Sequence, residues 1–255
     1  MSDQPTSLYG DQPQAPPPPP GLMDQLAGVF TEPKALMLRL RQRPVWIGAL
    51  LLAVGIGIVA GLIWASKVDM AEMTRHQMER TRDLFHMNIP DQAMEDAISK
   101  AEGKKPWLSA VSGAVFAIPF VYLVVALIVW GFAAMGTEDG ETSPTFGQAF
   151  SVTCVHYLVT LPATLLAGII ALLRPVGGHS LQQLMPTVLS FYVSPESGFV
   201  RGLLALVDPL WIFSFVVLAL GMRHALKTKT WAICACLTLF VVLGGGLRFV
   251  GGLFQ

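Results

Sequence analysis

The fold of this chain is decided by residues 44–66, PVWIGALLLAVGIGIVAGLIWAS, a stretch that contains no charged side chain. As an α-helix rising 1.5 Å per residue, it is long enough to cross a hydrocarbon core of roughly 30 Å. Trp46 and Trp64 stand near its two ends, where indole rings suit the membrane–water interfaces. We therefore predict that this stretch is a transmembrane helix.

Four further apolar blocks repeat the pattern. The 255 residues are 53% hydrophobic and 13% charged, whereas soluble domains carry about 25% charged residues. The predicted fold class is an all-α integral membrane protein: a bundle of five transmembrane helices, with an N-terminal interfacial amphipathic helix and a helical hairpin in the first loop. The four further spans are predicted at residues 107–135, 148–173, 202–222 and 230–247, with Pro119 and Pro162 as expected breaks.

The segment before the first span has two parts. Residues 1–20 form a proline-rich tail that is predicted to be disordered. Residues 21–43 are predicted to form short amphipathic helices on the membrane surface, ahead of a membrane domain over residues 44–255. The second helix would serve as a topology signal and anchor, or would recognise specific lipids. Its basic residues, which we predict to face the membrane surface, are Lys34, Arg39, Arg41 and Arg43.

Two segments between the spans carry structure of their own. Residues 67–106 form a hydrophilic loop with seven basic and eight acidic residues. In this loop the first span is expected to continue as a helix to about Asn88, and a second helix is expected from Pro90 to a stop at Gly103. This hairpin would either bind a partner or cover the bundle. Residues 181–193 are too short and too polar to span, and are expected to be interfacial or re-entrant.

Asp208 is the first candidate for a functional polar residue, because it lies at the start of an apolar block and precedes a proline. As a helix N-cap it would accept the free amides of the first turn. Alternatively, it would form a salt bridge or serve transport or catalysis. The basic residues in reach along the sequence are Arg174, Arg201 and Arg248. His156, inside the third block, is the second candidate, as a packing residue or as a proton carrier.

The sequence offers no enzymatic constellation. It contains no H-E-x-x-H, G-x-S-x-G or P-loop motif, and we expect neither catalytic residues nor a cofactor. The three cysteines, Cys154, Cys234 and Cys236, fall in apolar blocks where thiols act as small hydrophobes, so no metal site is expected. The net charge of zero gives no indication of nucleic acid binding.

Two functional classes remain. The first is a non-enzymatic scaffold or trafficking factor that lies in the lipid bilayer and binds other membrane proteins, or itself, through its spans and its hairpin. The second is a transporter, channel or lipid-moving protein with a path near Asp208 and the proline-broken spans. The first class is favoured because the predicted spans contain few of the polar groups that a solute path needs.

Three stretches resemble one known family. They are residues 28–46 (GVFTEPKALMLRLRQRPVW), residues 145–152 (TFGQAFSV) and residues 208–221 (DPLWIFSFVVLALG). The chain resembles prokaryotic members of the Yip-domain family, multi-spanning proteins named for interaction with Ypt/Rab GTPases. The resemblance implies five spans in the same order, a cytoplasmic N-terminus and an exoplasmic C-terminus. The Asp-Leu-Tyr-Gly-Pro motif of eukaryotic members is absent, which argues against Rab binding and for a bacterial plasma (inner) membrane.

The distribution of basic residues leaves orientation open. Seven Lys and Arg residues lie on the N-terminal side of the predicted topology and ten on the opposite side, so the positive-inside rule does not discriminate. The acids of the 67–106 loop more than match its basic residues, whereas those before the first span are less neutralised. This asymmetry favours a cytoplasmic N-terminus.

Overall fold

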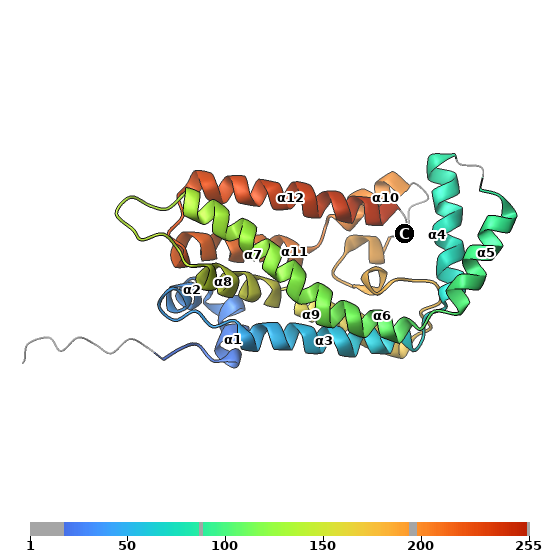
Figure 1. The fold of residues 1–255 in the computed structure, drawn as a ribbon, viewed down its shortest axis with the longest axis horizontal. Helices are drawn as coiled ribbons and strands as arrows, with labels where there is room; N and C mark the ends of the chain where they lie inside the picture. The colour runs from blue at the N-terminus through green and yellow to red at the C-terminus, as the bar shows by residue number, and fades with distance from the viewer. Residues whose placement is uncertain (1–17, 87–88, 194–197, 254–255) are drawn as a thin grey trace, which may run out of the picture.

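The computed structural model describes residues 18–86, 89–193 and 198–253, and these residues form helices and no strand (Figure 1). Most of the proline-rich tail, residues 1–17, lies outside the described part. The α-helices are α1 Leu22–Thr31, α2 Pro33–Gln42, α3 Ile47–Ala65, α4 Met70–Phe85, α5 Asp91–Glu102, α6 Pro106–Ser112, α7 Ile118–Met135, α8 Phe146–Leu158, α9 Leu161–Leu173, α10 Gly198–Ala205, α11 Pro209–Leu220 and α12 Thr230–Leu253. Short 3₁₀ or π segments are η1 Gly113–Ala117, η2 Leu181–Leu184, η3 Leu189–Phe191 and η4 Gly221–Ala225.

Three helical units in the described chain are long and apolar enough to cross a membrane: Ile47–Ala65, Pro106–Met135 and Thr230–Val250. The unit Pro106–Met135 continues through Pro119 without the expected break. It contains the π turn η1, which ends two residues before this proline. A fourth span results if α8 and α9, which meet at a 40° bend, are taken together. The break coincides with Pro162 near the start of α9, since proline cannot donate the amide that would continue α8.

The predicted fourth block, residues 202–222, is not one helix. It is interrupted between α10 and α11, because Pro209 lacks an amide proton and disfavours helical backbone at Asp208. The apolar helix that remains, Pro209–Ala225, has at most 17 residues and would reach about 25 Å, short of a hydrocarbon core of roughly 30 Å. Length and composition therefore give up to four spans among the described residues.

The helix of the first span ends with the span itself and does not continue beyond it as expected. α3 stops at Ala65 and a separate helix, α4, starts at Met70, so the predicted continuous helix towards Asn88 is wrong, and Asn88 itself lies outside the described residues. The reason is Asp69, whose carboxylate Oδ1 accepts the backbone amides of Ala71 and Glu72, both at 2.9 Å. An Asp in this position starts a new helix. α5 then packs beside α4, and Gly103 follows its last residue.

Residues 181–193 form the two short 3₁₀ segments η2 and η3 and no long helix. η2 packs against α9, where Leu184 is buried in a small apolar cluster with Ala167, Ala171 and Val176. This segment lies at the same end of the bundle as α4, α5 and α10 (Figure 1).

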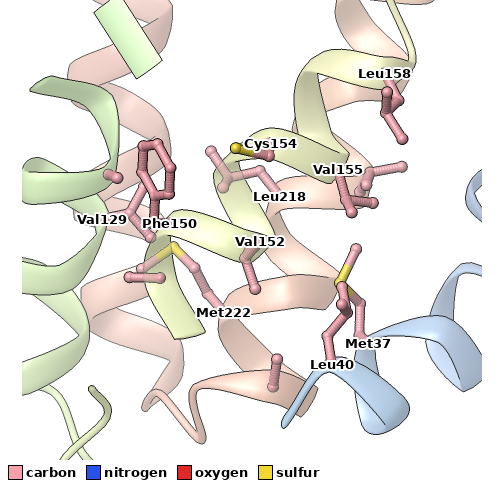
Figure 2. Packing of buried hydrophobic residues seen from close by; sticks show 14 of the residues in the cluster. Met37, Leu40, Val129, Phe150, Val152, Cys154, Val155, Leu158, Leu218 and Met222 are labelled. Carbon is pink, nitrogen blue, oxygen red and sulfur yellow. The ribbon is translucent and has the colours of Figure 1, made fainter. Parts of the chain in front are cut away.

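The main core lies at the other end, around α8. Figure 2 shows Met37 and Leu40 of α2 lying toward Val152 and Val155 of α8. Leu36, Met37 and Leu40 are 3%, 0% and 1% exposed. The apolar face of α2 that we expected on the membrane surface is therefore covered by the protein itself, because one amphipathic pattern serves a lipid surface and a helix bundle equally well.

Candidate functional site

The start of α11 and the end of α12 meet at a partly buried ion pair. Asp208, 2% exposed, accepts a hydrogen bond from the Arg248 guanidinium through Oδ2 at 2.9 Å. The second oxygen, Oδ1, accepts the backbone amides of Leu210 at 3.1 Å and Trp211 at 3.3 Å. The two alternatives drawn from the sequence, helix cap and salt bridge, are thus both realised by one carboxylate.

The cation of this pair is also held by an aromatic ring. The guanidinium carbon of Arg248 lies 4.8 Å from the centroid of the Trp211 ring, within the range of a cation–π interaction. Because an unpaired charge costs much more in an apolar region than a paired one, these contacts stabilise Asp208 and Arg248 where they are. Both carboxylate oxygens are engaged within the protein.

The other candidate residues are not part of this pair. Arg174, at the end of α9, lies with its guanidinium carbon 5.0 Å from the Phe191 ring centroid. Arg201 lies in α10, but its side chain is outside the described part of the structure. His156 of α8 is 6% exposed, and its Nδ1 lies 2.7 Å from the carbonyl oxygen of Ser214 in α11. This contact joins α8 to α11.

A groove between α11 and α12 lies next to the ion pair. It has a volume of about 680 Å³ and its lining is almost entirely apolar, with Ile212 and Val216 on one wall and Val241 on the other. A smaller hollow of about 430 Å³ continues it along α12 past Gly245 to Phe249, and the two share Leu206, Trp211 and Val241. This groove has no signal in the sequence, because its walls come from two helices whose relative placement only the tertiary structure defines.

The far end of the same two helices carries a cluster of ion pairs that the sequence reasoning missed. The acidic turn between α7 and α8 meets the basic turn between α11 and α12 and the end of α2. The pairs are Arg41–Glu141 at 2.6 Å, Lys227–Glu141 at 3.8 Å, Lys229–Asp139 at 2.7 Å and Arg223–Glu138. The signal available in the sequence was the opposite charge of two short turns, residues 136–147 and 223–229, but not their proximity.

These contacts also change the interpretation of the basic residues before the first span, which were predicted to face the membrane surface. Arg41 binds Glu141, and Arg39 binds Asp24 of α1 at 3.2 Å. In the described part of the structure Lys34 and Arg43 have no ion-pair partner. Two of the four predicted membrane-surface residues therefore form ion pairs within the protein.

A bundle of apolar helices, with charge kept to its ends and paired there, defines a multi-pass integral membrane protein. The chain belongs to the Yip1 domain family, whose sequence model matches residues 27–249, so the resemblance seen in the sequence is confirmed. It is similar to the membrane protein YknW of Bacillus subtilis (strain 168), with 24% identity over 234 residues that cover 89% of this chain and 92% of that protein. No solved structure matches it.

Proposed function

We propose that this protein is a non-enzymatic membrane scaffold that binds other membrane proteins through its α4–α5 hairpin. The observation that supports the proposal most directly is the position of the hairpin, which projects from one end of the bundle (Figure 1). Ala101 is the one buried residue among the described side chains of α4 and α5. Such a helix pair contributes little to the core, and it presents both charges and half-buried methionines to a partner.

The polar chemistry of the spans favours the scaffold over a solute path. Asp208, the strongest candidate for a transport residue, is occupied by two backbone amides and by Arg248. A conducting path needs groups that exchange partners with the solute. The alternative, a transporter or a lipid-moving protein, draws support from the bend between α8 and α9 and from the apolar groove beside α11.

The proposal includes a topology of five spans with the N-terminus in the cytoplasm of a bacterial cell and the chain in its inner membrane. In it Pro209–Ala225 is a short fourth span, and local thinning of the bilayer accommodates its length. The α1–α2 pair and the α11–α12 turn lie at one end of the bundle and the hairpin at the other (Figure 1). The hairpin would then meet its partner on the exoplasmic side.

Site-directed photocrosslinking in intact cells tests this function. A photoreactive amino acid at Glu95, exposed on α5, is expected to capture a reproducible partner, whereas the same group at Asp139, in the α7–α8 turn at the other end, is expected not to capture it. A third photoreactive amino acid is placed within one of the spans. Replacing residues 70–105 with a Gly/Ser linker should abolish capture of the partner at this site, while the protein still inserts into the membrane.

The transporter alternative has its own readout. The purified protein in liposomes is expected to give no ion leak and no lipid flip-flop above empty vesicles. A rate that appears with the protein and disappears in Asp208→Ala would overturn the scaffold proposal.

A further inference from the structure

The larger part of the groove between α11 and α12 has the length of one membrane leaflet. It runs along α12 from Thr230 to Val241, which corresponds to about 16 Å of helix at 1.5 Å per residue. The hydrocarbon core is roughly 30 Å thick, so this part covers about half of it. The smaller hollow continues the apolar surface toward Phe249, so the length of the larger part suits one acyl chain, and the charge at its Arg223 end favours a lipid over a partner's helix.

The walls of the groove suit a hydrocarbon chain. Ile212, Val216 and Val241 line it and are 52%, 48% and 48% exposed. A volume of about 680 Å³ is ample for a small-molecule site. Since the described helices leave it unfilled and the protein lies in a bilayer, acyl chains of lipids have direct access to it.

One end of the groove carries positive charge. Arg223 lines the groove at that end and its side chain is 48% exposed. The helix α2, which carries Lys34, packs against η4, the segment that contains Arg223. Seven basic residues share this end with five acids. The basic residues are Lys34, Arg39, Arg41, Arg43, Arg223, Lys227 and Lys229, and the acids are Asp24, Glu32, Glu138, Asp139 and Glu141.

Arg223 retains capacity for an anion despite its ion pair. Its Nη1 contacts Glu138 and lies 3.4 Å from the carbonyl oxygen of Thr228. A guanidinium has five N–H donors in a fork that matches phosphate geometry. Lys34, exposed and without an acidic partner in the described structure, adds a second, unneutralised charge.

We propose that the α11–α12 groove binds an anionic phospholipid from the leaflet on the side of the α11–α12 turn. One acyl chain lies between Val216 and Val241, and the phosphate is bound by Arg223 with Lys34 nearby. Basic pockets between transmembrane helices are a recurrent way to bind anionic headgroups. The site is independent of the hairpin, so it stands or falls separately from the scaffold function.

Native mass spectrometry of the full chain in mild detergent tests the site. With dioleoylphosphatidylglycerol and dioleoylphosphatidylcholine added in equal amounts, one phosphatidylglycerol is expected to remain bound, with a preference of about fivefold for each basic residue that contacts the headgroup. Arg223→Gln is expected to lower the preference about fivefold. Ala219→Trp, which fills the groove, is expected to remove the bound lipid altogether.

Two matched variants serve as controls. Leu127→Trp places the same bulk on the exposed face of α7, where Leu127 is 46% exposed, and Arg174→Gln removes a cation at the other end of the bundle. Both are expected to retain the lipid as the parent protein does. Equal retention of the two lipids, retention unchanged in Arg223→Gln, or no retained lipid would each overturn the proposal. A stable dimer that a Val216→Cys crosslink joins through the groove would overturn it as well.

Discussion

The carboxylate of Asp208 and the guanidinium of Arg248 lie 2.9 Å apart although 40 residues separate them in the sequence. The pair ties the start of α11 to the end of α12, and Asp208 caps α11 at the same time. One side chain therefore fixes where the fourth apolar helix begins and which helix lies beside it.

Replacing this carboxylate is expected to separate its two roles. Asp208→Asn keeps an oxygen that caps α11 and loses the ion pair, whereas Asp208→Ala loses both. We expect the free energy of unfolding to fall by about 1 kcal/mol for Asn and by about 2–3 kcal/mol for Ala. Thermal unfolding in detergent measures the difference. Arg174→Gln, which leaves the pair intact, is the control, and equal losses for Asn and Ala would contradict the capping role.

Close packing of η4 against α8 predicts a second effect. A Cβ at Gly221 would overlap Cγ1 of Val152, which is 0% exposed and cannot move into free space. Gly221→Ala is expected to lower the free energy of unfolding by about 1–3 kcal/mol through overpacking. Gly131→Ala, where nothing lies within 4 Å of the added carbon, is expected to be neutral or slightly stabilising because alanine favours helix. Unfolding temperatures that rank the two variants in the opposite order would refute this packing.

The paired turns predict an effect that depends on salt. Glu141→Gln removes the partner of both Arg41 and Lys227, whose pairs are about one-third exposed. We expect a loss of about 1 kcal/mol in stability at low ionic strength, which becomes smaller at high salt as the charges are screened. Asp139→Asn, whose side chain is 94% exposed, is the control and is expected to change nothing measurable. A loss at Glu141 that is independent of salt would point to packing instead of charge.

Labelling with a membrane-impermeant maleimide tests the proposed orientation. In a variant without Cys154, Cys234 and Cys236, a single cysteine at Glu95 is expected to react in intact cells stripped of any outer membrane. A single cysteine at Asp139 is expected to react only after permeabilisation, because the two positions lie at opposite ends of the bundle (Figure 1). The reverse pattern would place the N-terminus outside the cytoplasm.

Much of this protein follows from its sequence. Long stretches without charge, such as residues 44–66, have only one stable state in lipid, because a helix alone satisfies its own backbone hydrogen bonds there. The sequence alone therefore predicts the class of the protein, its all-helical fold, the break at Pro162 and the family. Proline acts locally, since it removes an amide wherever it stands.

Other features depend on which helices become neighbours. The sequence left Asp208 with a choice of Arg174, Arg201 and Arg248, and only the antiparallel placement of α11 and α12 brings Arg248 to it. The partner of the apolar face of α2 was ambiguous in the same way. Both a lipid surface and the core around α8 are compatible with the pattern of Leu36, Met37 and Leu40. The α11–α12 groove has no sequence signature at all. Hydrophobicity and helix breaks are properties of single segments, so the sequence determines them. Ion-pair partners, buried faces and grooves are properties of pairs of segments, so only the tertiary structure decided them.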